Sequence, residues 1–164
     1  MSLQISAEKL VAWNDVTAQR WHEFILANPI ILGLLCDIRN GRTVADTFQH
    51  IVAVELRYAQ RLAGLPESRY EEIPKNSIDS LHAAHELALG LVRSLLANPD
   101  YDWSTELIID TISAGRLRAS RETILLHLTL HSIRHYAQLA TLVRQQGFKT
   151  TWPMDFLMTE AQRA

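Results

Sequence analysis

The sequence contains a single cysteine among 164 residues, so no disulfide can form within the chain. That residue, Cys36, follows an apolar run, and we interpret it as a small core residue of a protein from a reducing compartment. No apolar run approaches the roughly 20 residues that a membrane-spanning helix needs. A basic segment followed by an apolar one is also missing at the N-terminus, so we expect no signal peptide and a cytoplasmic protein.

A long run of charge of one sign is also missing. The 16 basic and 18 acidic residues give a formal net charge of −2, and they are spread along the chain without a long run of either sign. Proteins that bind nucleic acids usually carry a basic patch, and anionic membranes attract polybasic segments. We therefore predict neither a nucleic-acid partner nor a membrane partner.

Helical periodicity is what the sequence does contain. Apolar residues recur at the spacing of one helix face in four stretches, at about residues 7–27, 43–64, 78–97 and 120–147. The chain length suits one domain, with 48% hydrophobic residues to form its core. This pattern predicts an all-α fold, a four-helix bundle that occupies residues 1–164 as a single domain.

Capping residues mark where these helices begin. Ser6 and Ser120 are suited to the N-cap position, because a serine side chain can accept a hydrogen bond from the first turn. Thr43 with Asp46 resembles a capping box in which aspartate replaces the usual glutamate. We therefore predict helix starts directly after Ser6, Thr43 and Ser120.

The segments around the last helix are less regular. Residues 106–112 are β-prone and residues 113–115 resemble a turn, so we predict a short hairpin between the third and fourth helices. The C-terminal tail contains Trp152 and Pro153, and we expect it to be packed irregular chain.

The fourth helix carries three of the seven histidines, His127, His131 and His135, at positions i, i+4 and i+8. Residues four apart lie on the same helix face, and two imidazoles so placed can converge on one metal ion. At about 100° per residue, His131 and His135 fall among the apolar residues Ile124 and Leu128, whereas His127 falls at the edge of this face. We predict that His131 and His135 point into the bundle.

A third ligand must come from another helix. His50 lies at the shoulder of the apolar face of the second helix, and His85 lies in the middle of the apolar face of the third. The spacing leaves both open, because a lone core histidine is more often hydrogen-bonded than metal-bound. His22 and His82 are interpreted as surface residues.

Three segments resemble the DinB-like (YfiT-like) family. Residues 43–55, TVADTFQHIVAVE, resemble its second helix, where a ligand histidine is followed five residues later by an acid. Residues 126–138, LHLTLHSIRHYAQ, resemble its fourth helix, and residues 147–155, GFKTTWPMD, resemble its ending. The resemblance implies an up-down-down-up four-helix bundle that binds one divalent metal ion, most often zinc or nickel. The implied ligands are His50, His131 and His135.

Three neutral imidazoles leave a fourth metal position open, as in catalytic rather than structural zinc sites. Zinc can lower the pKa of a bound water to about 7, and it deprotonates a coordinating thiol. Some relatives look like transferases that use small thiols such as bacillithiol, mycothiol or glutathione, so the resemblance favours a thiol S-transferase. The alternatives are a metal-dependent hydrolase, a non-catalytic metal-binding stress or interaction protein, and a helical module without metal.

Further side chains are expected around the metal or in a substrate pocket. Glu55 either orients a ligand histidine or forms an ion pair with Arg57, Arg61 or a neighbouring helix. The family commonly has Arg-Gly-Gln after its last ligand, whereas residues 136–138 are Tyr-Ala-Gln. If that arginine binds substrate in relatives, their substrate class does not transfer to this chain. Arg134 is an alternative arginine, but on a helical wheel it points about 80° away from the row that contains His131 and His135, called the ligand row below. The other candidates are Tyr58, His85, His127 and Gln138.

A second apolar row runs along the fourth helix, opposite the ligand row. Its members, at positions i, i+4, i+7 and i+11, are Leu126, Leu130, Ile133 and Ala137. A helix that is apolar on two sides is buried on two sides. We therefore predict a homodimer through this row, with coverage by the hairpin or the C-terminal tail as the alternative.

Overall fold

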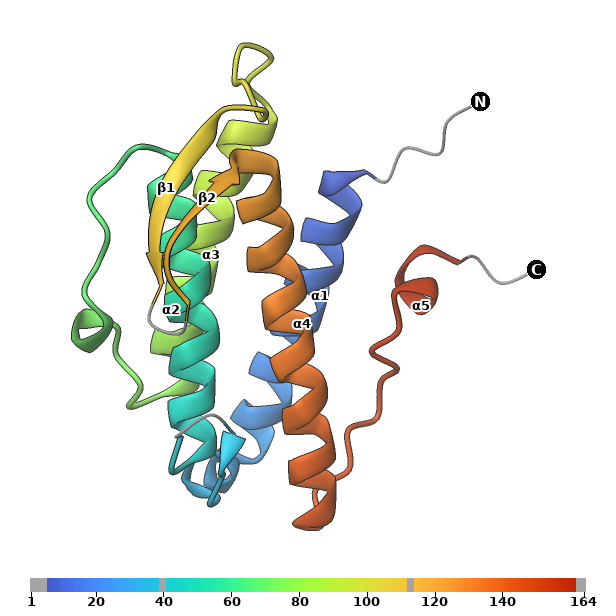
Figure 1. The fold of residues 1–164 in the computed structure, drawn as a ribbon. Helices are drawn as coiled ribbons and strands as arrows, with labels where there is room; N and C mark the ends of the chain where they lie inside the picture. The colour runs from blue at the N-terminus through green and yellow to red at the C-terminus, as the bar shows by residue number, and fades with distance from the viewer. Residues whose placement is uncertain (1–5, 39–40, 112–113, 162–164) are drawn as a thin grey trace.

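Four long helices lie side by side in the computed structural model, which describes residues 6–38, 41–111 and 114–161 (Figure 1). These helices are α1 (Ala7–Ala27), α2 (Val44–Leu62), α3 (Ile78–Leu96) and α4 (Arg121–Gln145). Helices α1 and α4 run in one direction, and α2 and α3 run in the opposite direction (Figure 1). The neighbouring pairs are α1 with α3, α3 with α2, α2 with α4, and α4 with α1. Side chains from α2 and α4 can therefore meet.

Side-chain caps explain where the helices begin. Ser6, Thr43 and Ser120 each accept a hydrogen bond from the backbone N–H three residues further on, and Ser77 does the same for α3. The Asp46 carboxylate accepts from the backbone N–H of Thr43 in return, which completes the capping box. The predicted helix starts are confirmed.

A small antiparallel sheet modifies the predicted fold class. Strands β1 (Glu106–Thr111) and β2 (Gly115–Ser120) pair with Thr111 opposite Gly115. The predicted hairpin is confirmed, although residues 112 and 113 of its turn lie outside the described residues. The protein is thus mostly helical with a two-stranded sheet, so the helical part of the predicted fold class is confirmed but a purely α class is not.

Aromatic rings form the centre of the core between α1, α2 and α4. Trp21 is fully buried, and its ring stacks on Tyr136 with 6.3 Å between centroids. Phe48 meets Trp21 edge-on at 5.5 Å. Cys36 is also buried, with its Sγ 3.3 Å from Oγ1 of Thr47, as expected of a core residue.

The C-terminal segment packs along α1 (Figure 1). Trp152 meets Trp21 edge-on with 5.7 Å between ring centroids. The tail then forms a short helix, α5 (Phe156–Glu160), whose Phe156 ring lies 5.5 Å from that of Trp13. The prediction of an irregular tail was therefore incomplete. Among the described helices, none combines the length and the hydropathy that crossing a membrane requires.

Candidate metal centre

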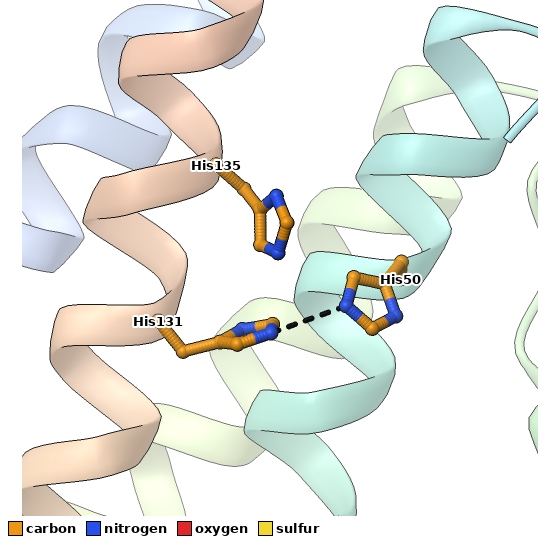
Figure 2. A group of neighbouring side chains, drawn as sticks. All are labelled: His50, His131 and His135. Atoms are coloured by element: carbon orange, nitrogen blue, oxygen red, sulfur yellow. Dashed lines mark hydrogen bonds between the residues drawn. The ribbon is translucent and has the colours of Figure 1, made fainter. Parts of the chain in front are cut away.

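Three histidine rings meet between α2 and α4 (Figure 2). Nε2 of His50 lies 3.1 Å from Nε2 of His131, and the ring centroids of His131 and His135 are 4.5 Å apart. One candidate ligand atom from each ring lies within 4.8 Å of the other two. Ligand atoms about 2.1 Å from a tetrahedral zinc ion are roughly 3.4 Å from one another. The donor atoms and their spacing therefore fit a single divalent ion.

The helices explain why these rings converge. His131 and His135 are one turn apart on the buried face of α4, at 5% and 2% exposure. His50 is half-buried on the neighbouring α2 and reaches across from its shoulder position. The inward direction predicted for His131 and His135 agrees with their burial.

The electrostatic environment keeps His131 in the form that a metal needs. Burial lowers the pKa of His131, and the adjacent rings of His135 and His50 lower it further, to about 2. The imidazole of His131 is therefore neutral at physiological pH. Only the neutral ring retains a lone pair with which to bind a metal ion.

Arg134 approaches the same site, contrary to the helical-wheel prediction. Its Nη2 donates a hydrogen bond to Nε2 of His135 at 3.2 Å. The wheel describes only the direction of the Cα–Cβ bond, whereas a long arginine side chain can fold back over the neighbouring residue. Arg134 therefore places a positive charge beside the three histidines.

A cavity of about 440 Å³ opens onto His50 and His131. Its other walls come from α2, from the first half of α4 and from the hairpin, including Ile109 and Leu117. Periodicity could not identify the hairpin wall, because it reveals which residues share a strand face but not what that face covers. A volume of this size is typical of a small-molecule site. The three-histidine cluster is thus connected to a space that can admit a ligand.

Two of the predicted pocket residues lie together in this cavity. The ring of Tyr58 meets that of His127 edge-on with 5.4 Å between centroids, and both residues line the cavity. His127 is exposed and at the edge of the ligand row, as the wheel predicts. Gln138, by contrast, is exposed on a separate surface hollow beside Asp37, and the structure does not bring it into this cavity.

Charged residues at the cavity are mostly basic. Arg57 and Arg61 both bind the carboxylate of Glu67, at 3.2 and 2.5 Å. With Arg134 and Asp110 included, the lining holds three arginines and two carboxylates. The lining thus has an excess of one positive charge. The sequence alone indicates Arg57 and Arg61 only as partners of Glu55.

Glu55 has a different partner. It is fully buried, and its Oε2 accepts a hydrogen bond from Nδ1 of His85 at 2.7 Å, while its Oε1 accepts from Asn14 at 2.7 Å. Of the alternatives weighed for Glu55, the pairing with a neighbouring helix is therefore the one observed. His85 belongs to this separate pair, as expected of a hydrogen-bonded core histidine, and the structure does not bring it to the three-histidine cluster.

Tyr136 stands where the family commonly has an arginine, and the structure shows that this position is core. Tyr136 is 1% exposed and packs between Trp21 and Phe48, facing away from the cavity lining. A guanidinium could not reach solvent from this aromatic cluster without rearrangement. The loss of the family's arginine is thus matched by aromatic packing in this chain.

A comparison with protein families agrees with the resemblance found in the sequence. A search of curated proteins finds no match to this sequence. The sequence model of the DinB family matches residues 4–163, which is nearly the whole chain. The chain therefore belongs to the DinB family.

Proposed function

We propose that the protein binds one divalent metal ion, zinc or nickel, through His50, His131 and His135 and acts as a thiol S-transferase. The observation that supports the proposal most directly is the position of the three-histidine cluster beside the 440 Å³ cavity, which His50 and His131 line. A structural metal site is closed by four protein ligands, whereas a catalytic site keeps one position for a substrate. Three imidazoles beside a cavity correspond to the second arrangement.

The chemistry follows from the charge of the donor set. Three neutral imidazoles contribute no negative charge, so a bound divalent ion would keep its full Lewis acidity and would lower the pKa of an entering thiol. The thiol proton leaves to solvent, and the sulfur then forms a bond to an electrophilic carbon, whose leaving group departs with its electron pair. Burial of His131 supports this role, since it keeps the ring neutral and available as a ligand.

The cavity residues supply recognition. Glutathione and bacillithiol carry carboxylates, and the cavity offers guanidinium groups to them from Arg134 and from the Glu67-paired Arg57 and Arg61. The apolar side chains of Ile109 and Leu117 provide a surface for the electrophile. The proposal places the protein in the cytoplasm, where small thiols are kept reduced.

The proposal is tested by turnover of a thiol and an electrophile. Tag-free protein loaded with zinc or nickel is incubated with glutathione, bacillithiol or mycothiol and a chromogenic aryl halide, and thioether formation is followed by absorbance. We expect turnover with at least one thiol and a loss of about 100-fold or more in His131→Ala. The matched control is His82→Ala, which removes a histidine from α3 outside the cavity.

Other results of this assay would support one of the alternative functions. Metal binding without consumption of any thiol would reject the transferase and leave a metal-binding stress or interaction protein. Hydrolysis of ester or amide substrates that depends on His131, without thiol transfer, would instead identify a metal-dependent hydrolase.

A further inference from the structure

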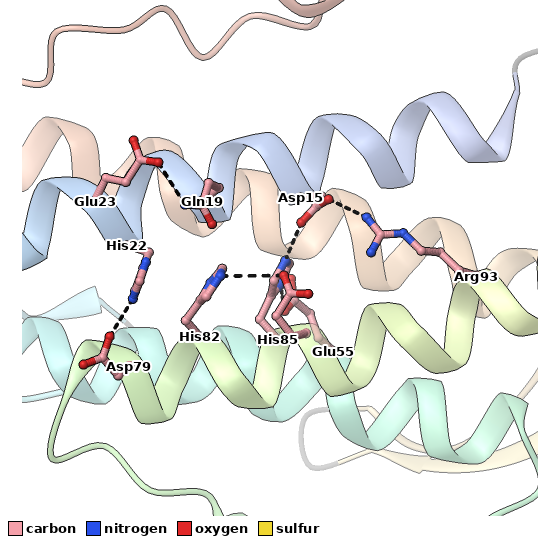
Figure 3. A network of polar contacts seen from close by, with 10 residues as sticks. Asp15, Gln19, His22, Glu23, Glu55, Asp79, His82, His85 and Arg93 are labelled. Carbon is pink, nitrogen blue, oxygen red and sulfur yellow. Dashed lines mark hydrogen bonds and ion pairs between the residues drawn. The ribbon is translucent and has the colours of Figure 1, made fainter.

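A second cluster of histidines and carboxylates lies between α1 and α3 (Figure 3). The rings of His22, His82 and His85 are stacked in a column, with centroid distances of 4.3 and 5.6 Å and interplanar angles of 16° and 20°. The carboxylates of Asp15 and Glu86 lie beside His85. One candidate ligand atom each from Asp15, His85 and Glu86 lies within 4.8 Å of the other two.

A hydrogen bond to Glu55 fixes the orientation of the His85 ring. Both His85 and Glu55 are buried, and Nδ1 of His85 donates to the Glu55 carboxylate at 2.7 Å. Asn14 holds the other oxygen of that carboxylate at 2.7 Å. With its Nδ1 proton used in this way, His85 directs Nε2 toward the α1 side of the cluster. A carboxylate behind the ring and a metal in front of it is how proteins commonly orient a histidine ligand.

The atoms in front of His85 have the spacing of metal ligands. Nε2 of His85 and Oδ1 of Asp15 form a long hydrogen bond of 3.5 Å, and this distance is also close to the roughly 3.4 Å between ligands of a tetrahedral zinc ion. Arg93 binds the other oxygen of Asp15 and so holds Oδ1 toward His85. Nε2 of His82 lies 3.6 Å from the Glu86 carboxylate.

The charge of the cluster favours a cation. Three carboxylates, from Asp15, Glu55 and Glu86, face one arginine, Arg93, and histidines that are neutral when bound to a metal. A divalent ion would balance the remaining negative charge. In the metal-free state burial lowers the pKa of His85, but Glu55 and Asp15 outweigh burial and raise it to about 10, so zinc must displace a proton from Nε2 to bind there.

We propose that Asp15, His85 and Glu86 form a second divalent-metal site and that the site takes zinc. Mixed imidazole and carboxylate ligands suit zinc. This site does not depend on the proposed transferase function, because its ligands lie on α1 and α3, whereas the three-histidine cluster lies on α2 and α4.

Zinc stoichiometry tests the proposal. Tag-free wild-type protein is dialysed against a zinc buffer, and bound zinc is measured by elemental analysis. We expect about two zinc ions per chain in the wild type and about one in the Asp15→Asn/Glu86→Gln variant. His50→Ala/His131→Ala should also retain about one, and adding the Asp15 and Glu86 substitutions should remove it. Zinc retained by His50→Ala/His131→Ala and lost after the Asp15 and Glu86 substitutions are added can only come from the second site. The second site is thus tested independently of the three-histidine site.

The variants are chosen so that the fold survives. Asp15 and Glu86 reach solvent, with side-chain exposures of 28% and 51%, and their amides keep the shape of the acids. The matched control is Asp79→Asn, which removes a carboxylate that contacts His22 at 2.7 Å but lies outside the proposed ligand set. It should leave the zinc content unchanged. No zinc in His50→Ala/His131→Ala, or equal zinc in wild type and Asp15→Asn/Glu86→Gln, would overturn the proposal.

Discussion

Nε2 of His50 lies 3.1 Å from Nε2 of His131, although 81 positions separate the two residues in the chain. The contact exists because α2 and α4 are neighbours in the bundle while α3 lies on the other side of α2. The two histidines one turn apart on α4 thus meet the third, His50, only when the whole fold is formed. Loss of metal binding and loss of tertiary structure must therefore be measured separately in every variant.

The buried pair of Glu55 and His85 should control the pH dependence of stability in metal-free protein. Burial raises the pKa of Glu55, but His85 and Asn14 outweigh burial and lower it below 4.5, so its contribution is present above pH 4.5 and is lost as the pH falls. The pKa of His85 rises from 6.5 to about 10, so its contribution is complete below pH 6.5 and is lost as the pH rises toward 10. We expect the free energy of unfolding, measured with urea and a chelator, to decrease between pH 6.5 and 10.

A substitution of His85 measures how much the pair of Glu55 and His85 contributes to the free energy of unfolding. His85→Ala leaves the Glu55 charge buried without its cation, and we expect a loss of about 3–5 kcal/mol in the free energy of unfolding at pH 6. The decrease between pH 6.5 and 10 should also be smaller in this variant. His82→Ala is the control, because His82 is half-buried and does not contact Glu55 through a hydrogen bond. An unchanged pH profile in His85→Ala would show that the pair does not govern stability.

Tyr136 should tolerate only an aromatic replacement. Tyr136→Phe keeps the packing against Trp21 and Phe48, and we expect a change below about 1.5 kcal/mol. Tyr136→Arg restores the residue common in the family but buries a guanidinium among aromatic rings, and it should cost more than about 3 kcal/mol. Urea denaturation of both variants measures this difference. Equal stability of Tyr136→Arg and wild type would place position 136 outside the core.

The apolar row on α4 predicts a homodimer. Leu130 is 51% exposed near the middle of this row, while Leu126 and Ile133 are half-buried. Light scattering coupled to size-exclusion chromatography should give twice the mass of the 18.7 kDa chain. Leu130→Glu should give the mass of one chain, because a carboxylate at a dimer seam is costly to bury. The control is Leu157→Glu, a similarly exposed leucine on α5. A monomeric wild type would reject this assembly.

Local signals were sufficient for much of this fold. Helix α1 begins where Ser6 predicts and spans the expected residues 7–27, and Thr43 and Ser120 cap α2 and α4 as expected. These features depend on hydrogen bonds within three or four residues, which a sequence displays directly. The burial of His131 and His135 follows in the same way from the helical period.

Features that depend on side-chain reach or tertiary pairing were not accessible in this way. The partner of Glu55 could have been any of several cations, and only the packing of α3 against α2 selects His85. Arg134 was placed away from the ligand row, because the wheel ignores the length of its side chain. The hairpin was predicted, but the cavity that it walls exists only once the strands lie over α2 and α4.

Metal content is the most direct measure of the central claim. Protein purified without a polyhistidine tag is equilibrated with zinc or nickel, and bound metal is determined by elemental analysis alongside circular dichroism. We predict that His50→Ala and His131→Ala each bind about one ion fewer than wild type while the helical signal persists, and that His127→Ala binds as wild type does. Absence of metal from the wild type, or equal metal content in wild type and both ligand variants, would contradict the account.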